Sequence, residues 1–600
     1  MRRGPVVLAA GLVALLGSFF LFFRPPQRMA PRPAVLAQGI HDAADAGAPG
    51  PFTQTGSSNI LPADYVGPSA CASCHAAQFT AWSQSAHSKM NQNPSGDTVM
   101  ADFGGAHIAF QGGEVTFDRD GDAFQMTLTR GGTRVRSYRV TRTVGSRFMQ
   151  FFIGKQVTGP EPRTDALYTT EHRLPFAYWF KLRRWLHASY FDPFGPDRDA
   201  AGAPVHDPYD HPERMQYRPN CMLCHNTYPY LYRLGSPAIR TGFPAQDLIF
   251  SRAAAASEIE KTVPVGAVTN PAYAARLDPD RDLVTLGVSC ESCHFGGREH
   301  AREDRPMHFQ PTSPALSIAP KDPSHKADDK GSNSWLAVSI CTQCHSAAQD
   351  TFPNGAGVAN SREALDLAAG SCSTKIKCTD CHDPHRPDER ESEAVNPRHL
   401  RACTSCHERF KEPRIAAQHG GHPEATRLTC LDCHMPRIVQ GLDNVTRSHT
   451  ISTPTDPRML AAGSANACSL CHLDRPISWT LRELERGWGK HIATDASWTA
   501  HYGERLERPV GQVWLASKSA PVRLLASQAY ARSKLAGDAL PDLIRALEDT
   551  EPVNRTFATF AVGRARGKTL TTAEYDPSDE PEVRRARIEQ LLAQAARGRP

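Results

Sequence analysis

A long block of mostly apolar residues stands near the start of this chain. The block runs from Val6 to Phe23, between Arg2-Arg3 and Arg24-Pro25-Pro26. Its length reaches the lower limit for a membrane-spanning helix and exceeds that of the apolar region in most signal peptides. We therefore expect residues 1–24 to form an uncleaved membrane anchor, with a removed signal peptide as the alternative. Arginines flank both ends, so the positive-inside rule does not orient the segment.

Polar and apolar positions alternate farther on, from Glu114 to Gly154. Asp120-Gly121 and Gly131-Gly132 stand at the positions of turns within this alternation. The pattern predicts a small β-meander at about residues 105–155. A calcium loop is the alternative for residues 118–123 (DRDGDA), but their spacing misses the EF-hand pattern, and a hairpin turn is favoured.

Apolar residues recur at helical spacing near the C-terminus, from Ala520 to Ala565. Pro521-Val522-Arg523 in this segment is echoed by Pro552-Val553-Asn554-Arg555. A repeat of this length is typical of helix pairs in HEAT-like arrays. We expect residues 498–600 to form a HEAT-like helical region that packs against the rest of the chain, because two units are fewer than a free array needs. A plain helical extension is the alternative.

Charge is nearly balanced, which narrows the choice of partners. The chain has 68 lysines and arginines against 63 aspartates and glutamates, a formal net charge of +5. A nucleic-acid-binding protein usually concentrates its basic residues in a stripe, and no such stripe is present in this sequence. We therefore expect no nucleic-acid partner.

Cysteine changes the picture most. Sixteen of the 17 cysteines form CxxC pairs, and a histidine directly follows each of the eight pairs. The paired cysteines are Cys71, Cys74, Cys221, Cys224, Cys290, Cys293, Cys341, Cys344, Cys378, Cys381, Cys403, Cys406, Cys430, Cys433, Cys468 and Cys471. The histidines are His75, His225, His294, His345, His382, His407, His434 and His472. We number these motifs one to eight in chain order.

Zinc binding, disulfide bonding and covalent haem attachment all use paired cysteines. A structural zinc site gives no reason for a histidine after every pair, and a disulfide framework does not require identical spacing. Haem attachment requires both, because two thiols bond to the vinyl groups and the next imidazole binds the iron. We predict eight covalent c-type haems, with the eight motif histidines as proximal ligands.

The motifs also bear on location and fold. Such haems are attached outside the cytoplasm, so we expect a periplasmic location, either anchored at the N-terminus to the cytoplasmic membrane or secreted. From Cys290 onward, successive motifs begin only 25 to 51 residues apart. We expect residues 63–497 to be a mainly α and irregular multihaem cytochrome c domain with a core of stacked haems. Residues 25–62, rich in proline, alanine and glycine, are expected to be a tether.

A low-spin haem that carries electrons needs a second axial ligand, and most other histidines are typical of surface or core positions. His385 follows His382 by three residues, and His300 follows His294 by six. Each stands on the proximal side of its own haem, so each should serve a neighbouring haem. The distal candidates are His87, His300, His385, His419, His422 and His449.

Cys372 stands outside the motifs. A buried or simply unpaired thiol is the favoured interpretation, and a distal thiolate ligand is the alternative.

The chain resembles the multihaem cytochromes c related to hydroxylamine oxidoreductase in the segments CASCHAAQFTAWSQSAHSKM, GVSCESCHFGGREH, CTDCHDPH, HGGHPEATRLTCLDCHMP and NACSLCHLDRPISW. That group includes the tetrahaem cytochrome of nitrifiers, the pentahaem nitrite reductases and the octahaem tetrathionate reductases. The resemblance covers about residues 65–490 and implies stacked haem pairs and mostly bis-histidine iron. Every motif here ends in histidine, whereas the nitrite reductases usually hold their catalytic iron by a lysine in CxxCK.

Two functions fit these features. The first is electron transfer, with redox partner proteins or a quinol-linked membrane complex as partners. The second is an oxidoreductase that acts on a small nitrogen or sulfur compound at one five-coordinate haem, for which no catalytic residue can be assigned. The haems of His75 and His225 are the candidates, and the stretch from Arg173 to Phe191 is expected either to roof a pocket there or to pack against haem. A haem-bearing scaffold is a third option.

Overall fold

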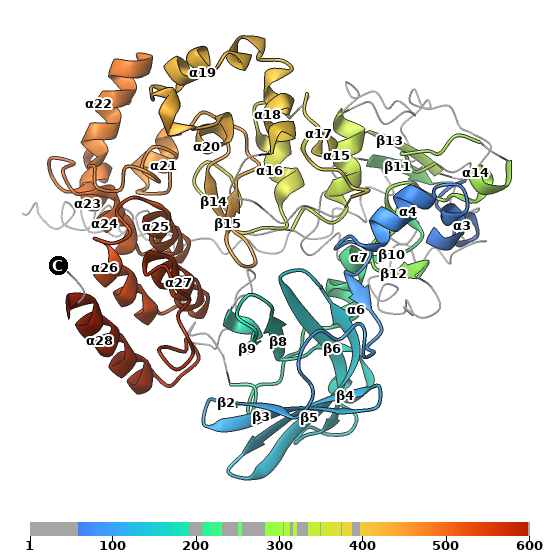
Figure 1. Ribbon diagram of the computed structural model, residues 1–600. Helices are drawn as coiled ribbons and strands as arrows, with labels where there is room; N and C mark the ends of the chain where they lie inside the picture. Colours follow the sequence, from blue (N-terminus) through green and yellow to red (C-terminus); the bar gives the residue numbers. More distant parts are fainter. Residues whose placement is uncertain are drawn as a thin grey trace, which may run out of the picture.

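The computed structural model describes residues 58–190, 207–230, 250–254, 283–303, 305–312, 316–320, 334–347, 350–373, 375–386 and 396–597. Figure 1 shows an antiparallel sheet, an arc of short helices that carries the cysteine motifs, and a group of longer helices at the C-terminal end. Residues 1–57 hold the expected anchor and most of the expected tether, and they lie outside the described residues. Within the described part of the chain, no helix is both long and apolar enough to span a bilayer.

The sheet is an antiparallel meander of nine strands. Their order is β2-β3-β4-β5-β6-β8-β9, with β1 beside β5 and β7 beside β6. The strands are β1 (Asn91–Gln92), β2 (Ala106–Phe110), β3 (Gly113–Asp120), β4 (Ala123–Arg130), β5 (Thr133–Val144), β6 (Met149–Thr158), β7 (His172–Arg173), β8 (Phe176–Trp179) and β9 (Arg184–His187). Asp120 pairs with Ala123 across the β3–β4 turn, where Gly121 has φ 59°. This segment is therefore a hairpin turn, which only a residue tolerant of positive φ allows.

The sheet is larger than the small insert that the sequence predicts. Strands β2 to β6 occupy the expected region, but β7, β8 and β9 carry the sheet on to His187. These last strands have only two to four residues each, so alternation cannot reveal them. The expected description as mainly α is corrected accordingly: the fold combines helical and irregular segments with a substantial sheet.

Aromatic side chains fill the inner face of the sheet. Phe117 and Trp185 stack with ring centres 3.7 Å apart, and Phe103 meets Phe124 and Phe152 edge to face at 5.3 and 5.2 Å. Each such pair adds about 1 kcal/mol beyond the burial of its area. The stretch around Trp185 thus packs in the core of the sheet, and its expected contact with a haem stays a prediction.

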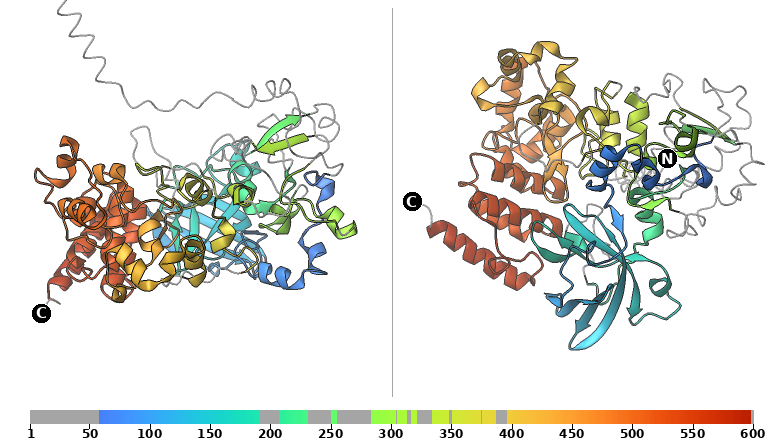
Figure 2. Two further views of the ribbon diagram at one scale, coloured as in Figure 1. Left: turned by 90° about the horizontal axis from the view of Figure 1, so that it is seen from above. Right: turned by 45° about the vertical axis from the view of Figure 1, so that its right-hand side comes forward.

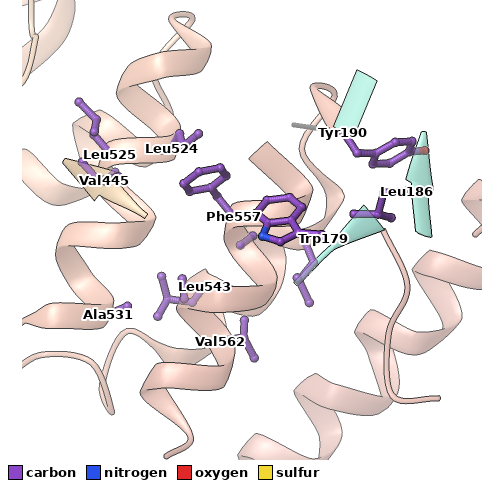
Figure 3. Packing of buried hydrophobic residues seen from close by; sticks show 14 of the residues in the cluster. Trp179, Leu186, Tyr190, Val445, Leu524, Leu525, Ala531, Leu543, Phe557 and Val562 are labelled. Carbon is purple, nitrogen blue, oxygen red and sulfur yellow. The ribbon is translucent and has the colours of Figure 1, made fainter. Parts of the chain in front are cut away.

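The C-terminal helices cover the β8–β9 end of the sheet, as Figure 2 shows from a second direction. The ring of Trp179 meets that of Phe560 at 5.3 Å, and Figure 3 shows Trp179 beside Phe557. Arg184 forms an ion pair with Asp576 at 2.5 Å. The two parts therefore share one continuous apolar core.

The C-terminal helices are η6 (Ala496–Trp498), α23 (Thr499–Tyr502), α24 (Val510–Leu515), α25 (Ala520–Arg532), α26 (Leu540–Arg545), η7 (Ala546–Glu548), α27 (Pro552–Ala565) and α28 (Pro581–Arg597). The proline of each sequence repeat stands in the first turn of α25 or α27, where its missing N–H costs nothing. Arg523 donates to the carbonyls of residues 517 and 518, and Arg555 donates to those of residues 549 and 550. The repeat thus reflects a shared way of beginning a helix, whereas a HEAT-like array stays a prediction.

Short elements make up the rest of the chain. The helices are η1 (Pro62–Asp64), α3 (Pro68–Ala72), α4 (Ala76–Ser83), α5 (Ala166–Thr169), η2 (Ala188–Tyr190), α6 (Tyr217–Asn220), α7 (Met222–His225), η3 (Cys290–Ser292), α14 (Arg298–Glu303), α15 (Ser334–Thr342), α16 (Glu363–Ala369), α17 (Cys378–Cys381), α18 (Pro397–Thr404), η4 (Glu408–Lys411), α19 (Pro413–Gly420), η5 (Glu424–Thr426), α20 (Cys430–His434), α21 (Pro457–Ala461) and α22 (Ile477–Trp488). Two-stranded pairings join β10 (Asn226–Thr227) to β12 (Thr285–Leu286), β11 (Phe250–Ala254) to β13 (Leu316–Pro320), and β14 (Arg437–Gln440) to β15 (Val445–Arg447). Helices α18, η4 and α19 contain no buried residue. Protein side chains therefore form no core in this part of the arc.

Candidate functional site

Each CxxCH motif is folded into a single helical turn. In seven motifs the backbone N–H of the histidine donates to the carbonyl of the first cysteine at 2.8 to 3.1 Å, and in motif seven the whole sequence Cys430–His434 forms helix α20. Residues four apart share one face of a helix, so the first thiol and the imidazole stand together. This placement suits a group bonded to both thiols and to the imidazole.

The other uses of paired cysteines find no support in the structure. None of the 17 cysteines, each of which lies in the described residues, forms a disulfide bond. Within those residues, no group of three or more histidine, cysteine or acidic side chains converges as a metal-ion site would. The identical spacing of the cysteines and the histidine after each pair remain the features that favour covalent haem.

Five motif histidines each face a second histidine at nearly the same distance. The ring centres are 6.1 Å apart for His75 and His300, 6.2 Å for His294 and His385, 6.3 Å for His382 and His449, 6.2 Å for His434 and His419, and 6.1 Å for His472 and His422. Two metal–nitrogen bonds of about 2 Å, with about 1 Å more from each nitrogen to its ring centre, span about 6 Å. Each pair is therefore spaced to hold one iron between its rings.

Hydrogen bonds orient several of these rings. The Nδ1 atoms of His300, His422 and His434 lie 2.6, 2.6 and 2.8 Å from the backbone carbonyls of Arg305, Gly420 and Ser452. A carbonyl only accepts, so each Nδ1 carries the proton and Nε2 keeps the lone pair that a metal requires. The rings are thus held in the tautomer of a ligand.

The pairs connect motifs that are distant in sequence. His300 and His385 face the histidines of motifs one and three rather than those of their own motifs. Helix contacts connect further motifs: α3 packs against η3, α15 against α17, and α18 against α20, which brings Cys71 near Cys290, Cys341 near Cys378, and Cys403 near Cys430. Motifs one and three, four and five, and six and seven are therefore neighbours.

One segment after motif six serves two other motifs. His419, on α19, faces motif seven, and His422, two residues beyond the helix, faces motif eight. Gly421, with φ 66°, turns the chain between them. The indole N–H of Trp488 donates to the carbonyl of His419 at 2.8 Å. A cavity of about 310 Å³ borders this segment and includes His422 in its lining.

His87 is the remaining distal candidate. Its carbonyl accepts the amide of Val288 at 2.9 Å, which places it beside the segment that leads into motif three. Its role as a ligand stays a prediction.

The sequence-based reasoning missed His399, whose ring centre lies 6.2 Å from that of His382, with the planes tilted by 53°. The available signal was its position four residues before Cys403, on the helix that leads into motif six.

Burial affects the motif histidines in different ways. Burial lowers the pKa of His225 and of His294 to about 4, which keeps both imidazoles neutral, as a metal ligand must be. Their Nδ1 atoms are buried without a hydrogen-bond partner among the described residues. Burial disfavours the charged form of His345, but its hydrogen bond to Glu363 and the negative charges near it together outweigh burial and raise the pKa to about 9.

The sheet contributes one wall to motif two. Val144 and Ile153 pack around Tyr217 and Met222, next to Cys221. The Tyr217 hydroxyl accepts hydrogen bonds from the side-chain amides of residues 91 and 226 at 2.5 and 2.8 Å. Strands β5 and β6 therefore border this motif, and β7, at the start of the expected Arg173–Phe191 stretch, touches the segment before it: the N–H of Arg173 donates to the carbonyl of Met215 at 2.9 Å.

Comparisons with known proteins agree with the motifs. The family model described as cytochrome c554 and c-prime matches residues 70–101, which contain motif one and His87. No curated protein matches the sequence significantly. Two solved structures are similar to it: the outer cell wall cytochrome OcwA, with 14% identity, coverage of 89% of this chain and 99% of that one, and a TM-score of 0.35; and the octaheme sulfite reductase MccA of Wolinella succinogenes, with 14% identity, coverage of 91% and 85%, and a TM-score of 0.31. The motifs and the family match together support a multihaem c-type cytochrome with covalently bound haem.

Proposed function

We propose that this chain is an exported octahaem c-type cytochrome that transfers electrons along closely packed, mostly bis-histidine haems. The observation that carries the proposal is the set of five histidine pairs spaced at 6.1 to 6.3 Å. An iron with two imidazole ligands is low-spin and exchanges electrons without binding a substrate. Haem supplies the redox chemistry when bound, and the chain supplies its ligands and its spacing.

The contacts between motifs support a continuous route. Motifs one and three touch through helices α3 and η3, and His385 connects motif three to motif five. Motif four joins motif five through helices α15 and α17, motif six joins motif seven through α18 and α20, and the His419–His422 segment ties motif seven to motif eight. His225 of motif two lies near His345 of motif four, and His399, on the helix that leads into motif six, faces His382 of motif five. Every motif therefore has a neighbour through which an electron can pass.

The proposal includes the setting of the protein. We propose that the chain lies outside the cytoplasm, because covalent haem is attached there, and that it is either held on the periplasmic side of the membrane by an N-terminal anchor or secreted. Redox partner proteins or a quinol-linked membrane complex would supply and remove electrons. Eight haems bring sixteen propionates, which would turn the formal charge of +5 into about −11 at full ionisation, so a basic partner surface is favoured.

Haem counting and electron paramagnetic resonance test the proposal. The purified protein should contain eight covalent haems by the pyridine haemochrome assay, and at least five irons should be low-spin. Reduced protein should pass electrons to a soluble acceptor at a rate that a small ligand such as cyanide does not lower. Fewer than five low-spin irons would overturn the electron-transfer proposal.

The surroundings of motif two favour a second candidate function. His225 is a motif histidine outside the five pairs, and strands β5 and β6 with Tyr217 form a wall beside its motif. Arg142 lies over the Tyr217 ring at 5.5 Å, and such donors can stabilise developing negative charge. A haem there with an open distal position would act on a small nitrogen or sulfur compound. A high-spin iron that binds nitrite or sulfite in the spectrum would favour this candidate.

A further inference from the structure

Glu363 bonds directly to a motif histidine. Its Oε2 accepts a hydrogen bond from Nδ1 of His345 at 2.9 Å, and its Oε1 accepts the backbone N–H of Ser361 at 2.8 Å. Both carboxylate oxygens are thus engaged, and the His345 ring is turned so that Nε2 faces away from the carboxylate. In the proposed haem protein, Nε2 of His345 is the atom that binds the iron of motif four.

The local backbone holds this carboxylate in place. The N–H of Ala364 donates to the carbonyl of His345 at 3.0 Å, which ties the start of α16 to the motif. Ser361 has φ 73°, a left-handed conformation that costs a residue other than glycine about 1 kcal/mol or more. The buried carboxylate of Asp366 fixes the same loop by accepting hydrogen bonds from Gly357 and Arg362 at 3.0 Å. These hydrogen bonds therefore offset the strain at Ser361. The left-handed conformation directs the backbone N–H of Ser361 toward Glu363.

Glu363 also lies near the neighbouring motif. Ala364, the next residue, belongs to a buried cluster that packs against Cys378 of motif five and against Ile451, two residues after His449. The ring of His449 faces that of His382 in motif five, and helices α15 and α17, which carry Cys341 and Cys378, are in contact. The Glu363 carboxylate is therefore bonded to the motif histidine of motif four and lies near the histidines of motif five.

We propose that Glu363 is a positioning residue that lowers the reduction potentials of two adjacent haems, those of motifs four and five. The inference rests on the proposed function. A carboxylate that accepts from Nδ1–H makes the imidazole a stronger electron donor to its iron, and negative charge nearby stabilises Fe³⁺ relative to Fe²⁺. The effect is larger at motif four, which has the direct hydrogen bond. The two haems are thus held at lower potentials than they would have without this carboxylate.

The test compares the holoprotein with its Glu363→Gln variant by spectroelectrochemical titration at one pH, after a haem count has shown eight in each. Each affected iron takes up one electron from the reductant. We expect the reduction equilibrium constant of one haem to rise about tenfold, which corresponds to about 59 mV for one electron, and that of a second haem to rise less. The low-spin resonance signals of the first haem should also shift, because its imidazole has lost electron donation.

Asp456→Asn is the matched control. Asp456 caps α21 by accepting from the N–H of Arg458 at 2.8 Å, and asparagine caps as well as aspartate, so the fold is kept while one negative charge is lost. Titration curves that superimpose, or equal shifts in both variants, would overturn the inference. If Glu363→Gln does not yield protein loaded with haem, Glu363→Asp is measured instead. Aspartate keeps the charge but is too short to reach His345, so the potential of the motif-four haem should still rise. An unchanged titration curve would overturn the inference. Failure of the wild type to hold haem would instead overturn the proposed function.

Discussion

The imidazole rings of His419 and His434 lie almost parallel, with planes 2° apart and centres separated by 6.2 Å. Fifteen residues separate them in the sequence, and no hydrogen bond between them explains their alignment. Two imidazoles that held one iron between them would stand at this separation. This pair is the most regular of the five and gives the clearest test of the ligand assignment.

Replacing His419 by alanine should convert one low-spin iron, that of motif seven, to a high-spin or water-bound state. The expected change in the electron paramagnetic resonance spectrum is the loss of one low-spin centre, with the haem count unchanged because both thiols of motif seven remain. His491→Ala is the control, since this exposed ring contacts only Glu485, at 3.5 Å, in the described residues. Identical spectra for the two variants would refute His419 as a ligand.

His385→Ala should affect motif three and leave its own motif intact. His385 faces His294 at 6.2 Å, although it follows His382 by only three residues. We expect one new high-spin centre in the variant. Replacing both Cys290 and Cys293 by serine removes the haem of motif three, so adding His385→Ala in that background should produce no further high-spin signal. A further signal there would show that His385 binds a different iron.

Glu574 predicts a dependence of stability on pH in the C-terminal helices. Hydrogen bonds from Thr571 and Arg566 outweigh burial and hold the pKa of Glu574 at about 2, against an ordinary value of 4.5. The Glu574 carboxyl therefore binds a proton more tightly in the unfolded chain than in the folded one. Its contribution to the free energy of unfolding is present above pH 4.5 and is lost as pH falls toward 2. Its size is on the order of 2 kcal/mol. The measurement is hydrogen exchange of peptides from α27 and α28, with each rate divided by the intrinsic exchange rate at the same pH. In the wild type this ratio should rise as pH falls from 4.5 toward 2, and Glu574→Gln should remove that rise.

The burial of Trp179 allows the contact between the sheet and the C-terminal helices to be tested by its contribution to the free energy of unfolding. Its side chain is fully buried against Phe560, so Trp179→Ala should destabilise the protein by about 3–5 kcal/mol through the cavity it leaves. The midpoint of urea unfolding, followed by far-ultraviolet circular dichroism, measures the loss. Val157→Ala, on an exposed position of β6, should shift the midpoint little. Equal midpoints for the two variants would show that the sheet and helices do not share a core.

The sequence predicts most clearly what depends on short spacing. The cysteine pairs and their histidines lie within one helical turn, so spacing alone indicates their chemistry. His300 and His385 were expected to serve neighbouring haems because each follows its own motif too closely, and the structure places each ring opposite another motif. The alternation before Gly154 indicated the first strands of the sheet for the same reason.

What the sequence does not reveal depends on distance in space. Glu363 stands 18 residues after His345, and no periodicity marks it as that histidine's partner. His399 stands four residues before Cys403, but that position does not reveal that its ring approaches His382 of another motif. Strands β7 to β9 are too short for alternation; β7 pairs with β6, and Trp179 of β8 packs against Phe560. Tertiary contacts decide all three.

The crossing of histidines between motifs has a consequence for maturation. In the proposed ligation, the iron of motif one awaits His300, and the iron of motif three awaits His385. If the chain is exported as proposed, a haem of motif one or three could be bonded to its thiols before the segment with its second histidine has emerged. Such a haem would pass through an incompletely ligated stage until that later segment arrives. A premature stop after residue 380 would leave motif three attached but open, a reactive iron in place of a carrier.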